Sequence, residues 1–141
     1  MQILGSYSYI PVSNLQEAAR WYGKHLGLRV VREDELFLEL RSASGVRVLL
    51  IGNDDARVTF HMNDSTGTQA SYGFVVPDLR EAHRQLAESG ITVGSVTDYE
   101  ALSFKFHDPD GNIVELWSDY PDPAAGWTVF EPLNGGQEED S

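Results

Sequence analysis

The segment from Phe106 to Ser118, Phe-His-Asp-Pro-Asp-Gly-Asn-Ile-Val-Glu-Leu-Trp-Ser, decides the fold of this chain. Its centre, residues 108–112, has the composition of a tight turn, because proline presets φ, glycine supplies a positive φ, and Asp and Asn bond their own backbone. Apolar runs flank this turn, which predicts a β-hairpin. Glu115 interrupts the second run, so its carboxylate is either a half-exposed outward group or a functional group in a cavity.

The chain contains two weakly similar halves. Residues 12–20 and 76–84 share Val, Leu, Glu, Ala and Arg at an offset of 64 positions. In both segments a β-like run ends and a helix begins, with Asn14 or Asp78 as the capping residue. The repeat therefore predicts two modules of the same construction.

Each predicted helix follows one β-like run and precedes three others. The expected runs are 2–12, 28–33, 35–42 and 45–52 in the first half, and 68–76, 91–97, 100–107 and 111–118 in the second. We therefore expect an α+β fold of tandem β-α-β-β-β modules, forming a single structural domain overall. The modules are residues 1–52 and 68–118, joined by a linker, 53–67, and followed by a C-terminal tail, 119–141.

Two connecting segments carry further signals. The linker has room for a short extra strand at 58–62. The tail contains apolar residues such as Trp127, which indicate docking on the body or on another subunit, with disorder as the alternative.

Composition narrows the classes of function. The net charge of −12 disfavours nucleic acid and anionic membranes as partners and would raise the local concentration of a cationic ligand, although a solubilising acidic surface explains it as well. No apolar run is long enough to span a membrane, and the start of the chain lacks the pattern of a secretory signal. The absence of cysteine excludes disulfides and fits a cytoplasmic protein.

The tandem modules, the helix entry at 10–15 and the ending at 108–116 together resemble the vicinal oxygen chelate superfamily. That superfamily includes glyoxalase I, extradiol dioxygenases, fosfomycin resistance enzymes and bleomycin resistance proteins. The resemblance covers residues 3–118 and is specific for the fold, whereas a fold does not fix a reaction. We expect the two sheets to form a curved mixed-sheet cup on the side away from the helices, and the chain to form a homodimer.

Metal-using members of that superfamily carry His, Gln or Glu at four positions, two in each module. The resemblance places these positions here at Tyr7, Leu49, Ser71 and Glu115. Only Glu115 is an ordinary ligand, and a divalent ion needs several His or carboxylate groups. We therefore expect no metal at the family position and no cofactor.

Glu115 is the strongest candidate for a functional residue. It has the same strand parity as Ile113 and Trp117, so all three should point into the cup. An ionised carboxylate beside an aromatic ring suits a cationic ligand, whereas a desolvated one has a raised pKa and suits acid–base catalysis. The alternative is a relic glutamate that bonds the hydroxyl groups of Tyr7 or Ser71.

Other residues are candidates for lining the cup. Tyr7 and Tyr9 share one face of the first strand, where they either contact a ligand or pack in the core. Ser71 is expected to make a minor polar contact. Glu39 belongs to a polar set that alternates with leucines, so one set faces the helix layer and the other the cup. The sequence alone leaves open which is which, although the polar set fits the cup better. His61, in the linker, could close over the cup, whereas the histidine at 107 is expected to bond the turn backbone.

Three functions remain open at this point. The first is a metal-independent small-molecule binding protein of the bleomycin-resistance kind, which sequesters a cationic or aromatic compound. The second is a lyase, isomerase or cyclase with Glu115 as base and Tyr7 as acid. The third is a metal-dependent lyase or dioxygenase with a displaced metal site, in which His61 or His107 joins Glu115.

Overall fold

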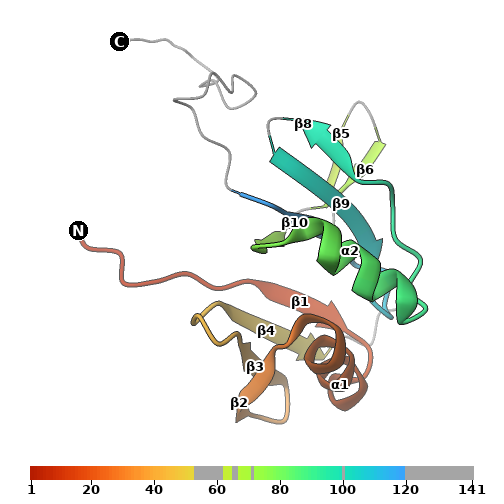
Figure 1. The fold of residues 1–141 in the computed structure, drawn as a ribbon. Helices are drawn as coiled ribbons and strands as arrows, with labels where there is room; N and C mark the ends of the chain where they lie inside the picture. The colour runs from red at the N-terminus through yellow and green to blue at the C-terminus, as the bar shows by residue number, and fades with distance from the viewer. Residues whose placement is uncertain (53–61, 65–66, 71, 100, 120–141) are drawn as a thin grey trace.

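The computed structural model of the chain describes residues 1–52, 62–64, 67–70, 72–99 and 101–119 (Figure 1). The first module comprises β1 (Tyr9–Val12), α1 (Leu15–Leu26), β2 (Arg29–Glu33), β3 (Phe37–Arg41) and β4 (Arg47–Gly52). The second comprises β7 (Gly73–Val75), α2 (Leu79–Glu88), β8 (Thr97–Tyr99), β9 (Ala101–His107) and β10 (Ile113–Trp117). Between them lies a hairpin of β5 (Met62–Asp64) and β6 (Gly67–Gln69).

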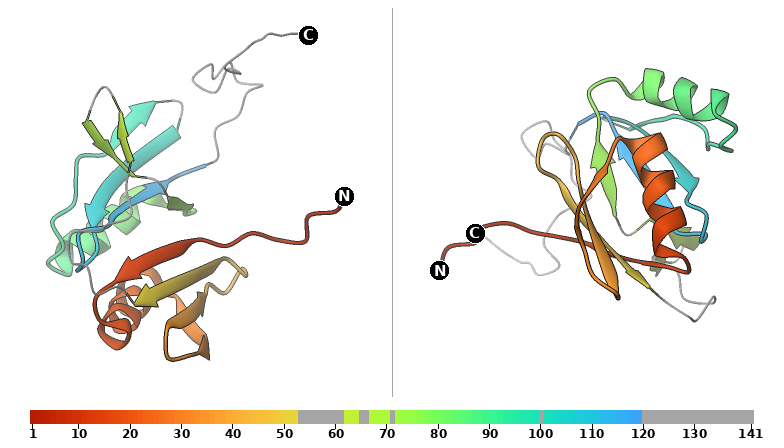
Figure 2. Two further views of the ribbon diagram at one scale, coloured as in Figure 1. Left: turned by 180° about the vertical axis from the view of Figure 1, so that it is seen from behind. Right: turned by 90° about the horizontal axis from the view of Figure 1, so that it is seen from below.

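The two modules have the same sheet topology. The strand order is β1-β4-β3-β2 in the first sheet and β7-β10-β9-β8 in the second. In each sheet the strand before the helix pairs in parallel with the last strand of its module, and the remaining pairs are antiparallel. The expected α+β fold of tandem β-α-β-β-β modules is confirmed, and Figure 2 shows one helix packed on each sheet.

Three of the expected strands are shorter than the sequence indicates. In the run at 68–76, the strand before α2 is only Gly73–Val75, and Gly67–Gln69 pairs with Met62–Asp64 instead. Only Tyr9–Val12 of the run at 2–12 forms a strand, and the residues before it extend as an arm (Figures 1 and 2) whose last residue, Ser8, still accepts a hydrogen bond from the amide of Leu49 at 2.8 Å. The reason is that β4 begins at Arg47, so most of the arm has no neighbouring strand with which to pair. In the run at 91–97, Val93 makes only an isolated bridge to Phe106, and β8 begins at Thr97.

The linker and the tail are described only in part. The expected strand at 58–62 overlaps β5 at Met62 alone, and residues 58–61 lie outside the described residues. The tail beyond residue 119 also lies outside them, so its expected docking stays a prediction.

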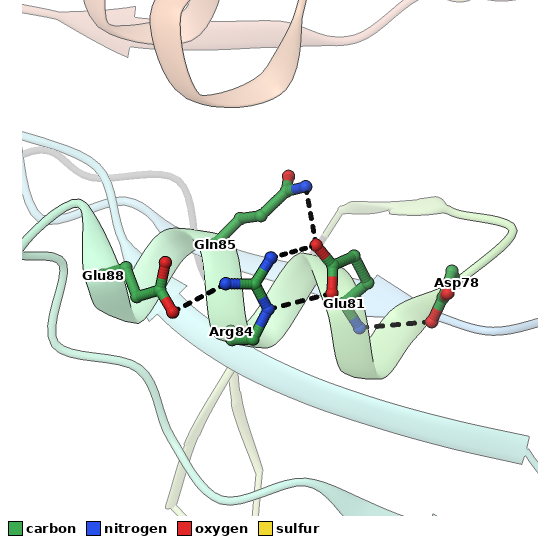
Figure 3. A network of polar contacts seen from close by, with 5 residues as sticks. All are labelled: Asp78, Glu81, Arg84, Gln85 and Glu88. Carbon is green, nitrogen blue, oxygen red and sulfur yellow. Dashed lines mark hydrogen bonds and ion pairs between the residues drawn. The ribbon is translucent and has the colours of Figure 1, made fainter.

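Side-chain caps set the start of both helices. The Asn14 side chain accepts a hydrogen bond from the amide of Glu17 at 3.0 Å, and Asp78 accepts one from the amide of Glu81 at 3.1 Å. Along the exposed side of α2, the Arg84 guanidinium bonds both Glu81 and Glu88, as Figure 3 shows. Neither of the two described helices is long and apolar enough to cross a lipid bilayer.

Each module has its own apolar core between its helix and one face of its sheet. The buried residues of the first core are Ile10, Val12, Ala18, Ala19, Tyr22, Leu28, Leu38, Leu40, Val48 and Leu50. Those of the second are Leu79, Leu86, Phe104, Phe106, Val114 and Leu116. Because side chains alternate along a strand, the intervening residues point to the opposite side of each sheet, which we call the helix-free face.

The turn at 108–112 joins the two modules. Asp108 is buried and accepts hydrogen bonds from the Tyr22 hydroxyl at 2.7 Å and from the Asn112 side-chain amide at 2.7 Å. The same Asn112 amide donates to the carbonyl of Pro11 at 2.9 Å. The segment that predicts the hairpin therefore also fixes the first module against the second.

A tyrosine pair extends this joint. The hydroxyls of Tyr22 and Tyr72 are 2.8 Å apart, and Tyr22 itself is buried. Burial raises the pKa of both phenols well above the ordinary range, so both are neutral at physiological pH. Trp21 and Tyr72 also pack against both apolar cores, which makes the joint partly hydrophobic.

Candidate functional site

The helix-free face of the first sheet is arranged in rows that run across the strands. Tyr9 lies opposite Leu49, Leu49 lies opposite Glu39, and Glu39 lies opposite Arg32. The expected placement of Glu39 on the side away from the helix agrees with the geometry, because Leu38 and Leu40 occupy the core. This row brings an aromatic ring, an apolar side chain and a charged cluster onto one surface.

The second sheet has a matching row. Glu115 lies opposite Lys105 on β9 and opposite Gly73 on β7. Leu49 and Glu115 therefore hold equivalent places, each flanked by the strand before the helix and by the third strand of its module. The register also makes Glu39 the counterpart of Lys105.

Glu115 forms an ion pair in this row. One of its carboxylate oxygens is 3.3 Å from the Lys105 ammonium, and 20% of its side chain is exposed. On its other side the backbone of Gly73 approaches so closely that a Cβ there would lie 2.2 Å from the Glu115 carbonyl oxygen. The carboxylate thus has a basic partner on β9 and no side chain beside it on β7.

Trp117 lies one row further along β10 on the same face as Glu115. Its cross-strand neighbours are Val75 on β7 and Ser103 on β9, and it is half-buried. The Ser103 hydroxyl is 2.8 Å from that of Thr97 on β8. The indole therefore lies between an apolar edge and a pair of hydroxyls.

Glu39 is the most enclosed charged group among the described residues of the first sheet. Its side chain is 5% exposed, and one carboxylate oxygen accepts hydrogen bonds from Arg41 at 2.8 Å and from Arg47 at 2.9 Å. The Arg32 guanidinium is 3.7 Å from the other oxygen. The hydrogen bonds from Arg41 and Arg47 hold the pKa of Glu39 below its usual range, so it is ionised at neutral pH.

Tyr7 and Tyr9 form an exposed aromatic pair beside Leu49. Their ring centroids are 5.1 Å apart in an edge-to-face arrangement, and their residues are 56% and 51% exposed. Tyr9 belongs to β1, whereas Tyr7 lies in the arm before it, so the expectation that both belong to the first strand is wrong for Tyr7. The exposure argues against core packing for both rings.

The remaining candidates divide into two groups. Ser71 and His61 lie outside the described residues, so their expected roles stay predictions. His107 is exposed and lies opposite Ile113, on the same face as Glu115 but in the next row.

The residues at the positions where metal-using members of the superfamily hold their ion do not suit a divalent ion. Leu49 offers only carbon atoms, and the Glu115 carboxylate already faces the positive charge of Lys105. Across the part of the chain that the structure describes, no group of three or more His, Cys, Asp or Glu residues is placed to hold a metal ion.

Sequence reasoning missed the basic partners of both carboxylates. Lys105, Arg32 and Arg47 contact Glu115 or Glu39 and were not singled out. Strand parity is the signal that indicates Lys105. This residue alternates with the buried Phe104 and Phe106, so its side chain lies on the face away from the core, which is also the face of Glu115 on the neighbouring strand.

Comparison with known proteins agrees with this architecture. Residues 3–116 match the family described as the Glyoxalase/Bleomycin resistance protein/Dioxygenase superfamily. A catechol-2,3-dioxygenase of Bacillus subtilis (strain 168) is 27% identical over 118 residues, which cover 82% of this chain and 41% of that protein. This chain therefore spans about two fifths of the length of that relative.

Solved structures with the same fold include proteins of different kinds. A bleomycin resistance determinant encoded on the transposon Tn5 has a TM-score of 0.66 at 17% identity, covering 83% of this chain and 98% of the other. The oxidase ChaP-H2 has a TM-score of 0.66 at 18% identity, covering 85% and 96%. At these identities the likeness concerns the fold alone. The family match extends over residues 3–116, and the repeated modules and the shared fold agree with it. This chain therefore belongs to the Glyoxalase/Bleomycin resistance protein/Dioxygenase superfamily.

Proposed function

We infer that this chain is a metal-independent small-molecule binding protein that holds and sequesters an aromatic compound against the helix-free faces of its sheets. The observation that carries this proposal is the exposed Tyr7–Tyr9 pair beside Leu49, two of these three residues lying at positions that the resemblance to the superfamily assigns to metal ligands. Aromatic rings and an apolar side chain bind an aromatic compound by stacking and by burial of apolar area.

The charge of the ligand is a separate question. The net charge of −12 attracts cations at long range. However, Glu39 and Glu115 each already contact a basic side chain, so neither is a free counter-ion for a cation. The geometry therefore supports the aromatic part of the proposal more strongly than the cationic part. The relative named catechol-2,3-dioxygenase adds a reason to include phenols among the candidates.

A homodimer is part of the proposal. In the described residues β1 and β7 are both edge strands, and edge strands present unpaired backbone groups to a second chain. The arm also exposes apolar side chains, with Ile3 at 81% and Leu4 at 89%. Light scattering at several concentrations tests this part, and a monomer at all of them would contradict it.

The proposal is tested by a thermal-shift and calorimetric screen of the full chain with phenols, neutral aromatics and cationic aromatics. We expect an aromatic ligand to raise Tm and Tyr9→Ala to weaken its binding. Leu36→Ala is the matched control, because Leu36 is an exposed apolar residue in the turn between β2 and β3. Failure of all aromatic classes to bind would contradict the proposal.

A second candidate is a lyase, isomerase or cyclase in which Glu115 acts as base and Tyr7 as acid. The observation in its favour is that the Glu115 carboxylate is partly exposed and lies 3.3 Å from the Lys105 ammonium, which places a carboxylate oxygen and N–H donors side by side for a bound compound. Glu115→Gln separates the two candidates. Lost turnover with retained binding would favour the enzyme, whereas weakened binding without any turnover in the wild type would favour sequestration.

A further inference from the structure

We propose that the first sheet carries an oxyanion-recognition site, in which Arg41 and Arg47 bind the carboxylate or phosphate group of an aromatic ligand. This rests on the proposed binding function and names the chemical class of its ligand. The site lies on the same helix-free face as Leu49 and Tyr9, because Arg47 precedes Leu49 by two residues on β4.

The strand register places three arginines in one row. Arg29 on β2 lies opposite Arg41 on β3, and Arg41 lies opposite Arg47 on β4. Neighbouring strands are about 4.8 Å apart, so the row spans roughly 10 Å, which is the size of a small aromatic acid. The adjacent row adds Arg32 beside Glu39. These two rows therefore present four guanidinium groups and one carboxylate.

Within the described residues the arginines are only partly neutralised, because Arg32, Arg41 and Arg47 share the single carboxylate of Glu39. Arg41 and Arg47 both donate to the same oxygen of Glu39 through Nε, so these two bonds do not use their terminal nitrogens. Their side chains remain 45% and 35% exposed. Arg84 on α2 shows the opposite arrangement, since one guanidinium there lies between two carboxylates (Figure 3).

A row of like charges is costly for folding. Like charges directly opposite each other on neighbouring strands destabilise a sheet, and Glu39 offsets only part of the repulsion. The chain has ten basic residues and a net charge of −12, yet four of those ten residues are in these two rows. A cluster of side chains that lowers stability is expected at a functional site, where a bound ligand supplies the missing opposite charge.

The chemistry of the row selects its ligand. Arginine presents a planar fork of donors that matches a carboxylate or a phosphate. Glu39 fixes the Nε side of two of these forks, which reduces the side-chain entropy lost on binding. Tyr9 stands in the row that contains Glu39, so a ring attached to the oxyanion can reach an aromatic side chain.

The test is isothermal titration calorimetry of the full chain with benzoate, phenyl phosphate and inorganic phosphate. Phenol and benzamidine are the neutral and cationic comparisons. We expect benzoate or phenyl phosphate to bind more tightly than phenol or benzamidine, with affinity falling as salt rises. Arg41→Gln and Arg47→Gln should each weaken the anionic ligand about tenfold, equivalent to roughly 1.4 kcal/mol. Arg20→Gln, an equal charge change on the exposed side of α1, should leave the affinity unchanged.

Glu39→Gln provides an independent readout. It removes the negative charge that competes with a bound anion but keeps a side-chain oxygen that can accept from the Nε groups of Arg41 and Arg47, so it should raise the affinity for the anionic ligand. Far-ultraviolet circular dichroism checks that each variant is folded. The proposal is overturned if phenol binds as tightly as benzoate, if benzamidine is preferred, or if both arginine variants keep wild-type affinity. Equal affinity for inorganic phosphate and phenyl phosphate would overturn the aromatic part. Phenol binding without preference for anions leaves the proposed function standing, and no binding by any aromatic defeats both.

Discussion

Leu49 and Glu115 occupy equivalent positions in the two modules. Each lies on the last strand of its sheet, between the strand that precedes the helix and the third strand of the module. One position is an apolar side chain and the other is a carboxylate paired with Lys105 at 3.3 Å. The symmetry of the fold is thus preserved while the chemistry at its two equivalent positions differs.

This relationship predicts that the purified protein carries no stoichiometric transition metal. Leu49 cannot coordinate an ion, and Lys105 repels one from Glu115. Metal analysis by mass spectrometry should find far less than one ion per chain, and chelator treatment should leave Tm unchanged. One tightly bound ion per chain, with a fall in Tm on its removal, would contradict the account.

Gly73→Ala should destabilise the second module. A Cβ at this position would lie 2.2 Å from the Glu115 carbonyl oxygen, so β7 has to move away from β10. We expect a loss of about 1–3 kcal/mol in the free energy of unfolding, measured by urea denaturation. Gly5→Ala is the control, because a Cβ there meets nothing within 4 Å. Equal stability of the two variants would show that the close approach is not a constraint.

Tyr22→Phe should weaken the joint between the modules and change the response to alkali. The variant loses the hydrogen bond to Asp108 at 2.7 Å, and the expected cost is about 1–3 kcal/mol. The folded state raises the pKa of Tyr22, so its stabilising effect is complete below the ordinary tyrosine pKa of about 10 and is lost as pH rises above it. Urea midpoints across that range should therefore fall less steeply in Tyr22→Phe than in the wild type. Tyr9→Phe removes a hydroxyl at an exposed position and is the matched control.

Glu39→Gln should reduce the sensitivity of the first sheet to acid. Arg41 and Arg47 lower the pKa of Glu39, so its contribution to stability is present above the ordinary glutamate pKa of about 4.3 and is lost as pH falls below it. The variant should be less stable at neutral pH and should lose less stability on acidification. Glu35→Gln, in the exposed turn before β3, serves as the control. An acid response unchanged by Glu39→Gln would argue against the arginine cluster as its source.

Local chemistry made much of the fold predictable. The Asp-Pro-Asp-Gly-Asn turn, the caps at Asn14 and Asp78 and the repeat offset indicate element type and order, because they depend on short-range geometry. The residues of the arm favour a strand by their own composition, so the sequence predicts one there. Whether it forms a strand depends on β4, which starts only at Arg47.

The candidate site was less predictable for a related reason. Glu39 and Glu115 were found from strand parity, but their partners come from neighbouring strands, and cross-strand register is not visible in one strand alone. The contacts of Lys105 with Glu115 and of Arg47 with Glu39 therefore depend on strand pairing that the sequence does not show. Two further candidates, Ser71 and His61, lie outside the described residues and stay predictions.

The central claim is that an aromatic compound binds on the helix-free faces, and amide chemical-shift mapping during titration tests it most directly. With the tightest aromatic ligand from the screen, the account predicts saturable shifts at Tyr9, Leu49, Glu115 and Trp117, with the exposed side of α2 around Arg84 unaffected. Shifts confined to the helices, or no saturable shift with any aromatic ligand, would contradict it.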